Sequence, residues 1–247
     1  TLNNSKHQNT LSELMMESLI KELSEAAIDD SVRVIILSAK GSIFCAGHDL
    51  KEITQARNNE DSGYAYFKKL FNTCSELMQL IVNNPKPIIA EVSGIATAAG
   101  CQLVASCDLA IASDESMFAT PGVNIGLFCS TPMVALSRNI SNKHAMEMLL
   151  TGDMIDAKKA TEIGLINNNV SSKNLMQETL TLAKKVASKS SMTLKVGKQA
   201  FYVQSSLELS EAYKYTSKTM TDNLLKRDAK EGINAFLEKR SPDWKDK

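Results

Sequence analysis

The hydrophobic positions in the first part of the chain change from helical to strand periodicity. Apolar residues recur at the spacing of one helix face at Leu11, Leu14, Met15, Leu19 and Leu23. Ser12 stands where a helix N-cap is expected. Residues 32–37 are rich in β-branched side chains, which predicts a mostly buried strand, and a tight loop is expected at 44–49.

The same alternation continues to about residue 112. Residues 52–63 are polar and charged, so we expect them to form the most flexible segment. A helix is predicted over 67–80, and the prolines of NNPKP at 83–87 end it. The next predicted elements are a strand at 88–92, a small-residue turn at 93–100, a helix at 101–107 and a strand at 109–112. Alternating strands and helices predict an α/β layer fold with ligands at the strand ends.

The pattern becomes purely helical from Lys143 onward. Helices are predicted at 143–151, 156–163, 173–189, 191–205, 207–226 and 229–239. No flexible linker separates the two parts, and the sequence shows no internal repeat. The chain therefore reads as one α/β unit that ends in a helical region.

Composition and charge remove several classes of partner. With 43% hydrophobic and 23% charged residues, the chain has the composition of a soluble globular protein. Basic and acidic residues both number 28, so no net field attracts nucleic acid or an anionic membrane. A few lysines beside one pocket could still hold a small anionic ligand.

The cysteines and the hydropathy predict an intracellular protein. Five cysteines are an odd number, and none lies in a CxxC pattern, so neither a disulfide framework nor a zinc site is expected. No apolar run approaches the ~18 residues that span a bilayer, and residues 1–10 are polar. We expect no metal, no membrane and a reducing compartment.

Two small-residue turns, at 44–49 and 96–100, present backbone N–H groups with little side-chain cover. The second turn also opens directly onto a helix, whose N-terminus adds positive potential. Such donors can build an oxyanion hole. Either turn alone would indicate only a tight turn, and it is the ordered pair that favours a site.

These turns belong to a longer set of motifs. The set includes FCAGHDLK at 44–51, KPIIA at 86–90, GCQL at 100–103, LTG at 150–152 and EGINAFLEKR at 231–240. The sequence resembles the enoyl-CoA hydratase/isomerase, or crotonase, superfamily over nearly its whole length. Residues 98–108 and 118–132 further resemble one subgroup of that superfamily.

The resemblance implies a fold and an assembly. It implies an α/β crotonase-like spiral of β/β/α units with a C-terminal helical trimerisation region. Residues 1–190 would form the core, without the first strand of the family, and 191–247 would pack on the core and on a neighbouring subunit. We expect a trimer, or a hexamer of two trimers, in the cytoplasm of a bacterium or the mitochondrial matrix of a eukaryote.

The resemblance also implies the chemistry and its residues. Members of the family stabilise a thioester enolate, and the two oxyanion donors correspond to the backbone N–H groups of His48 and Ala99. The coenzyme A wall corresponds to Lys6, Thr10, Ala46, His48, Asp49, Leu50 and Lys51, with Phe236 and Lys239 from the C-terminal region. Lysines suit the phosphates of coenzyme A as point charges. Coenzyme A enters as part of the substrate, and no permanently bound cofactor is expected.

The chain departs from the family at the catalytic acids. The two hydratase glutamates correspond to Gln102 and Gly122, neither of which can exchange a proton. The acid positions of related isomerases correspond to Asn124 and lie near Ser130. We therefore expect weak or absent hydratase activity. The double change Gln102→Glu with Gly122→Glu should raise it if the loop at Pro121 accepts a side chain.

Two other functions remain open, as does the role of the His48 ring. The string at 47–49 resembles methylmalonyl-CoA decarboxylase, whose reaction needs an oxyanion hole but no base, although the tyrosine of that enzyme falls on or beside Cys129. A non-catalytic acyl-CoA-binding protein would also keep the lysines and lose the acids. The His48 ring either packs beside the pocket or acts as a base near neutral pH. The retained backbone donors favour thioester chemistry.

Overall fold

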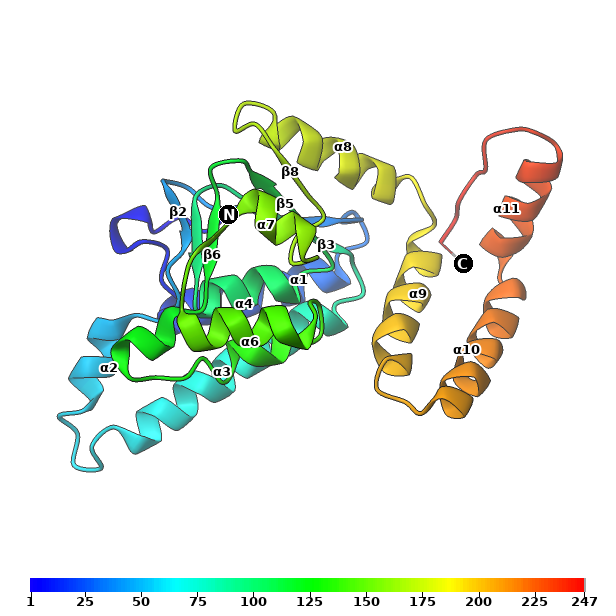
Figure 1. Cartoon of the computed structure of the whole chain (residues 1–247). Coiled ribbons are helices and arrows are strands. Elements are labelled where there is room, and N and C mark those ends of the chain that lie inside the picture. The colour runs from blue at the N-terminus through cyan, green and yellow to red at the C-terminus, as the bar shows by residue number, and fades with distance from the viewer. Residues whose placement is uncertain (247) are drawn as a thin grey trace.

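The computed structural model describes residues 1–246, which fold into two four-stranded sheets surrounded by helices (Figure 1). The strands are β1 (Ile35–Leu37), β2 (Ile43–Cys45), β3 (Ile88–Val92), β4 (Ile95–Thr97), β5 (Leu109–Ser113), β6 (Met117–Ala119), β7 (Ile155–Asp156) and β8 (Asn168–Val170). The helices before residue 152 are α1 (Glu13–Ile28), α2 (Leu50–Ala56), α3 (Tyr64–Asn83), α4 (Ala99–Ser106), α5 (Pro132–Leu136) and α6 (Asn142–Thr151). The later helices are α7 (Ala157–Glu162), α8 (Leu175–Ala187), α9 (Ser191–Gln204), α10 (Leu209–Leu224) and α11 (Arg227–Leu237), and short 3-10 helices span Ser5–His7 and Pro121–Ile125.

Strands β1 to β6 enter the two sheets in turn, whereas β7 joins β6 in the same sheet and β8 returns to the other. One sheet has the order β1-β3-β5-β8 and the other β2-β4-β6-β7, and every pair is parallel except β6 with β7. Parallel neighbours need crossover connections, which α3, α4 and the loops between the sheets supply. The alternation confirms the predicted spiral of β/β/α units.

Several elements follow the sequence pattern closely. The Ser12 hydroxyl accepts a hydrogen bond from the Met15 N–H at 3.2 Å, so α1 begins where the cap was predicted. It continues to Ile28, and Leu14 lies on its exposed face and not in the core. Strand β3 and the helices from α6 to α11 lie within a few residues of their predicted bounds.

The structure places regular elements inside three segments that the sequence had marked as flexible or as turns. The segment predicted to be flexible, 52–63, begins inside helix α2, because Asp49 caps that helix by accepting a hydrogen bond from the Lys51 N–H at 2.8 Å. The turns predicted at 44–49 and 93–100 contain the end of β2 and all of β4. Three-residue strands are too short for a periodicity to mark them.

The core lies between the sheets and helices α1, α3 and α4. All eight residues of α4 are buried, so this helix crosses the interior of the molecule. Phe44 in β2, Phe118 in β6 and Leu77 in α3 are fully buried around it. Helix α4 therefore runs from the end of β4 into the deep core. Within residues 1–246, no helix combines the length and hydrophobicity needed to cross a bilayer.

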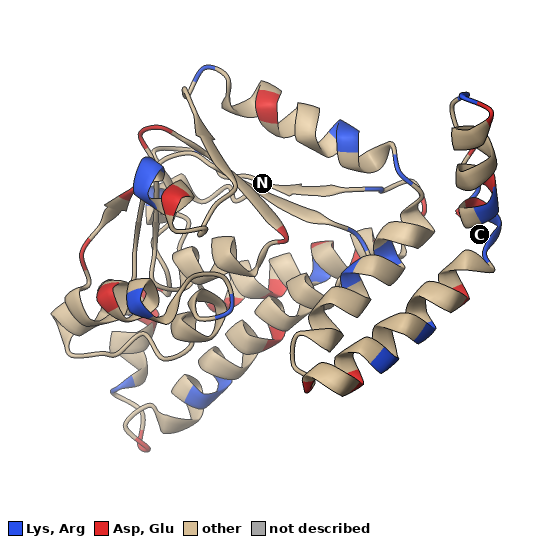
Figure 2. Ribbon diagram, turned by 45° about the vertical axis from the view of Figure 1, so that its right-hand side comes forward, with Lys and Arg blue, Asp and Glu red and all other residues tan. Residues whose placement is uncertain are grey.

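Helices α9, α10 and α11 project from one side of this core (Figures 1 and 2). A buried ion pair attaches α9, in which Lys198 Nζ lies 2.7 Å from Asp108 Oδ2. The same ammonium donates to the carbonyl oxygens of Ile81 and Lys86 at 3.0 and 3.1 Å. Tyr202 donates its hydroxyl to the other oxygen of Asp108 at 3.0 Å.

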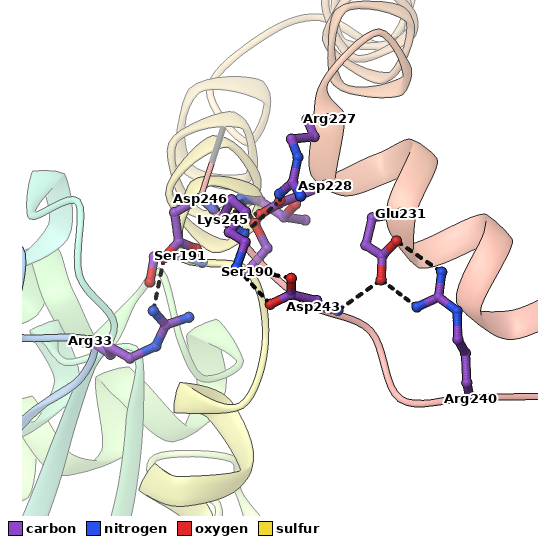
Figure 3. A network of polar contacts seen from close by, with 11 residues as sticks. Arg33, Ser190, Ser191, Arg227, Asp228, Glu231, Arg240, Asp243, Lys245 and Asp246 are labelled. Atoms are coloured by element: carbon purple, nitrogen blue, oxygen red, sulfur yellow. Dashed lines mark hydrogen bonds and ion pairs between the residues drawn. The ribbon is translucent and has the colours of Figure 1, made fainter.

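Residues 241–246, which we call the C-terminal strap, run back from α11 to the core (Figure 3). The Asp246 carboxylate accepts from Arg33 Nη1 at 2.8 Å and from the backbone N–H of Ser191. Arg33 Nε also donates to the Ala187 carbonyl at 2.8 Å, at the end of α8. One arginine of the core thus holds both the junction between α8 and α9 and the C-terminal strap.

The other side of the C-terminal strap is bound to α11. Asp228 is 1% exposed, and its carboxylate accepts the backbone N–H groups of Lys245 and Asp246, both at 2.9 Å. Trp244 Nε1 donates to the Ser188 carbonyl at 2.9 Å. These bonds fix the orientation of α11 relative to the junction.

Candidate active site

The carboxyl ends of three neighbouring parallel strands meet at one edge of the second sheet. Strand β4 lies between β2 and β6, with Cys45 beside Ala96 and Thr97 beside Ala119. The segments that follow these strands are 46–48, 98–99 and 120–122. Ligands of parallel α/β sheets bind at such an edge, and the sheet brings His48, Ala99 and Gly122 to it.

The first two of these segments touch backbone to backbone. Gly47 has a φ of +90°, and a Cβ there would lie 2.9 Å from Ala98 Cβ and 3.3 Å from Ala99 N. A Cβ on Gly100 would lie only 2.1 Å from the Cys45 carbonyl oxygen. Only glycine allows these two approaches. They hold the two predicted oxyanion turns together.

The backbone N–H groups of His48 and Ala99 find no acceptor in the described chain, residues 1–246. Ala99 is the first residue of α4, where an N–H has no partner inside the helix. Ala98 before it has an unusual backbone conformation (φ 50°, ψ −120°), held by its N–H bond to the Ala119 carbonyl at 2.9 Å. Two free donors beside a buried helix N-terminus can stabilise an anionic oxygen.

The His48 side chain is packed and neutral. Its Nδ1 lies 3.2 Å from the Leu11 carbonyl oxygen, which requires Nδ1 to carry the proton. The ring stands edge-on to Phe71 at 5.6 Å between centroids, and Nε2 is buried with no partner in residues 1–246. Burial lowers the pKa of His48, while the Leu11 carbonyl acts in the opposite direction. Since Nε2 is sealed from solvent, this geometry favours the packing interpretation over a base.

Gln102 lies one turn after Ala99 on α4 and is 4% exposed. Its Oε1 is 3.9 Å from the thiol of Cys74, which points at it from α3. An amide at this position offers hydrogen bonds but no proton exchange.

Gly122 has no room for a side chain. A Cβ there would lie 2.5 Å from the Leu127 carbonyl oxygen and 2.8 Å from Cys129 Sγ. The Leu127 N–H bonds the Gly122 carbonyl at 2.9 Å, so the loop that closes the position is itself tied to it. The predicted gain of activity from Gln102→Glu with Gly122→Glu required the loop at Pro121 to accept a side chain. That condition is not met, because the loop after Pro121 leaves no space for the second glutamate.

The predicted coenzyme A residues of the first fifty positions lie around the first turn. Ala46 N donates to the Gln8 carbonyl at 3.2 Å, and Leu11 N donates to the Gly47 carbonyl at 2.7 Å. These bonds place the segment that carries Lys6 and Thr10 beside 46–48. Lys6 is exposed, and the Thr10 hydroxyl is buried with no partner among the described residues.

Helix α2 continues this wall. An open depression of about 460 Å³ lies along it, lined by Leu50, Lys51, Thr54, Gln55 and Asn58. Leu50 and Lys51 are exposed, whereas the Asp49 carboxylate is engaged as the cap of the helix. Asp49 is thus a structural member of the wall.

Phe236 and Lys239 lie elsewhere. Both are exposed, on or just after α11, at the end of the molecule opposite α2 (Figure 1). A single chain does not bring them to the two turns. They can join the site only from a neighbouring copy.

The remaining polar candidates add no acid or nucleophile. Asn124 and Ser130 are exposed, and Ser130 donates to the Phe128 carbonyl at 3.3 Å. The five cysteines are free and buried, and burial raises the pKa of Cys101 to about 12. Burial also raises the pKa of Cys129, which the Gly122 N–H partly opposes. No three potential ligands gather as a metal site within residues 1–246.

Sequence reasoning missed the residues that shape the site from other elements. Phe71 and Cys74 come from α3, and Leu127 comes from the loop after 121–125. Thr120, whose buried hydroxyl has no partner in residues 1–246, directly precedes Pro121. No local motif marks these residues, because Phe71 and Cys74 come from a helix distant in sequence and the approach of Leu127 to Gly122 depends on how the loop folds.

This fold and this pair of turns are those expected of the enoyl-CoA hydratase/isomerase family, and comparison with known proteins supports the same family. The family model described as enoyl-CoA hydratase/isomerase matches residues 1–247. The chain therefore belongs to the enoyl-CoA hydratase/isomerase family.

Among its relatives is the mitochondrial enoyl-CoA hydratase domain-containing protein 3 of Rattus norvegicus, the subgroup that 98–108 and 118–132 resemble. It is 50% identical over 243 residues, 98% of this chain and 79% of the rat protein. A probable enoyl-CoA hydratase of Bacillus subtilis is 33% identical over 241 residues, 96% of this chain and 91% of that protein. The crystal structure of human enoyl coenzyme A hydratase domain-containing protein 3 superposes with a TM-score of 0.92 at 50% identity, covering 98% of this chain and 95% of that one.

Proposed function

We propose that this chain binds coenzyme A thioesters and stabilises their enolates with the backbone N–H groups of His48 and Ala99. The observation that carries the proposal is the contact of Gly47 with Ala98 and Ala99, which holds two unpaired donors together. Donors that are already in place need no reorganisation when charge develops on the thioester oxygen.

The reaction is not hydration. Water addition needs a group that takes a proton from water and a group that gives one to carbon. Gln102 can do neither, and the closure of position 122 by Leu127 and Cys129 leaves no space for a second acid. Lys6 and Lys51 would hold the phosphates of coenzyme A along the wall that ends at α2.

Decarboxylation is the second candidate, and the lack of an acid at positions 102 and 122 favours it. Loss of carbon dioxide from a 2-carboxyacyl thioester breaks the C–C bond and leaves its electron pair in the enolate. The two backbone donors would stabilise this enolate, and a proton from solvent would complete the product. No base is needed to remove a carbon-bound proton.

We propose that the chain lies in mitochondria if its source is eukaryotic. Relatives about 50% identical to it carry names that describe those proteins as mitochondrial. We also propose that it self-associates as a trimer or hexamer.

Calorimetry with butyryl-CoA and crotonyl-CoA tests the proposal. We expect both to bind, and crotonyl-CoA to be hydrated at least ~10²-fold more slowly than by an enzyme with both acids. Gly47→Ala should abolish binding, because its Cβ meets Ala98. Gly164→Ala is the matched control: Gly164 has a similar φ of +84°, but its Cβ would meet only the Asn139 carbonyl at 3.7 Å. Absence of binding at millimolar ester, or rapid hydration, would contradict the proposal.

A further inference from the structure

The first of the two oxyanion donors belongs to a peptide group that follows a glycine. Gly47 has a φ of +90°, and glycine lets the peptide plane after it take many orientations. The Gly47 carbonyl accepts a hydrogen bond from the Leu11 N–H at 2.7 Å. Because the peptide between Gly47 and His48 is planar and trans, its C=O and N–H groups point in opposite directions. The His48 N–H therefore points away from Leu11.

The imidazole of His48 bonds the same leucine at its other backbone group. Leu11 and His48 form an isolated parallel bridge, and Nδ1 lies 3.2 Å from the Leu11 carbonyl oxygen. A carbonyl oxygen only accepts, so Nδ1 is the donor. Together the two hydrogen bonds close a cycle, which runs from Leu11 through the Gly47 carbonyl, the His48 nitrogen and the imidazole back to Leu11. The nitrogen that carries the oxyanion donor is a member of this cycle.

Both partners in the cycle are supported by other elements. Asn9, two residues before Leu11, is fully buried, and its amide donates to the carbonyl oxygens of Lys40 and Ile43 at 2.9 and 2.8 Å. Ile43 begins β2, the strand that leads to the first turn, so these bonds tie the leucine to that strand. The imidazole packs edge-on against Phe71 of α3. The cycle thus has a fixed support on each side.

We propose that the His48 imidazole is the positioning group of the first oxyanion donor: through Leu11 it fixes the direction of the backbone N–H of its own residue. This inference rests on the proposed function, which uses that N–H to polarise a thioester carbonyl. It gives the side chain a role beyond packing, because a ring of similar size without a donor would leave the cycle open.

The direction of the N–H matters because a hydrogen bond weakens steeply as its angle departs from linear. With the cycle open, the bond between Gly47 and Leu11 would remain alone, and the freedom of glycine would let the peptide plane tilt. A donor acts best on a developing charge when it needs no reorganisation. A tilted N–H would therefore polarise a bound carbonyl less.

Infrared spectroscopy of bound butyryl-CoA, labelled with ¹³C at the thioester carbon, tests this inference. The two backbone donors should lower the stretching frequency of the bound carbonyl relative to the ester in water. His48→Phe keeps an aromatic ring against Phe71 but lacks the donor, so it should lose most of this shift. His48→Asn places an amide NH₂ at the position of Nδ1 and should retain the shift. His144→Phe, on α6, is the matched control and should keep the shift of the unchanged protein.

The order of the variants separates three roles of the imidazole. A packing role would preserve the shift in His48→Phe and reduce it in His48→Asn, whereas a base would leave the shift unchanged in both. Either result, or loss of the shift in both variants, would overturn the inference and leave the proposed function standing. Butyryl-CoA that does not bind the unchanged protein, or that binds without a lowered frequency, would overturn both.

Nitrogen NMR of the unchanged protein provides a second test if His48→Phe does not fold or does not bind the ester. The imidazole should carry its proton on Nδ1 and none on Nε2, both alone and with butyryl-CoA bound. The spectrum of His48→Asn identifies the two signals by their absence. A proton on Nε2 in place of Nδ1 would overturn the inference, since the cycle through Leu11 could not then close.

Discussion

At the scale of single residues, the packing around Gly122 explains why no acid stands at position 122. The Leu127 carbonyl oxygen and Cys129 Sγ occupy the space that a side chain would need. A substitution that only exchanged glycine for glutamate would have to move a backbone carbonyl. The loop would therefore have to be rebuilt before an acid could stand there.

Gly122→Ala should lower the free energy of unfolding by about 1–3 kcal/mol, the usual cost of overpacking. The Cβ would lie 2.5 Å from backbone that is tied to the same residue by a hydrogen bond. Gly197→Ala is the control, since a Cβ there meets nothing within 4 Å and alanine favours the helix α9 by up to about 1 kcal/mol. Urea unfolding measures both. Equal stability of Gly122→Ala and the unchanged protein would show that the loop moves freely.

The small-residue turns drew attention to positions 48 and 99, and the family resemblance assigned positions 102 and 122 to the site. The sequence could not show what surrounds them. The thiol of Cys74 approaches Gln102 across 28 residues of chain, and the ring of Phe71 approaches His48 from the same helix. Such contacts depend on the crossing of α3 over α4, which no local pattern encodes.

At the scale of elements, the attachment of α9 depends on one buried cluster. The side chains of Lys198 and Asp108 are 8% and 16% exposed, and the ammonium also satisfies two carbonyl oxygens of the core. Burial lowers the pKa of Lys198, although the Asp108 carboxylate opposes that shift. Removing one partner of a buried pair leaves the other charge uncompensated.

Lys198→Met should accordingly lower the free energy of unfolding by about 3–5 kcal/mol. It leaves Asp108 with only the Tyr202 hydroxyl and the backbone N–H of Ile88. Lys195→Met on the exposed face of α9 should change stability by less than about 0.5 kcal/mol. Denaturant unfolding of the two variants makes the comparison, and similar stabilities would mean that the cluster does not anchor α9.

Long elements were predictable and short ones were not. Helices α3 and α8 carry several turns of apolar periodicity, and β3 is a five-residue, mostly apolar strand preceded by two prolines. Strands β4 and β6 have three residues each, and β4 lies inside a segment that resembles a turn. Helix α2 was missed because its surface is polar and its cap, Asp49, belongs to the motif of the first turn.

At the scale of the whole molecule, helices α9–α11 expose much apolar surface. The exposed side chains include Phe201, Leu209, Tyr213, Met220, Leu225 and Phe236, each more than half exposed. Contiguous apolar surface on a protein of this size marks an interaction site. A neighbouring copy would cover these helices, and it would also carry Phe236 and Lys239 to a site that they cannot reach within their own chain.

Light scattering at micromolar concentration should give three or six times the mass of one chain. The double change Leu209→Glu with Tyr213→Glu, on the exposed face of α10, should shift the protein toward monomers, because each glutamate would lose its water in the interface. We expect acyl-CoA affinity to fall with assembly, since the contribution of Phe236 and Lys239 is lost. Monomers that bind acyl-CoA as well as the unchanged protein would contradict this arrangement.

The bond from Arg33 to Asp246 joins residues 213 positions apart in the chain. Contacts of such sequence separation form late, because the loop between them must close first. During synthesis, the sheets and α4 can assemble while the residues of the C-terminal strap have not yet been made. Until then Lys198 and Tyr202 hold α9 to the core, Arg33 holds the end of α8, and the apolar faces of α9–α11 lie open. Attachment of α9–α11 to their own core through the C-terminal strap and association of the same helices with a neighbouring copy therefore compete.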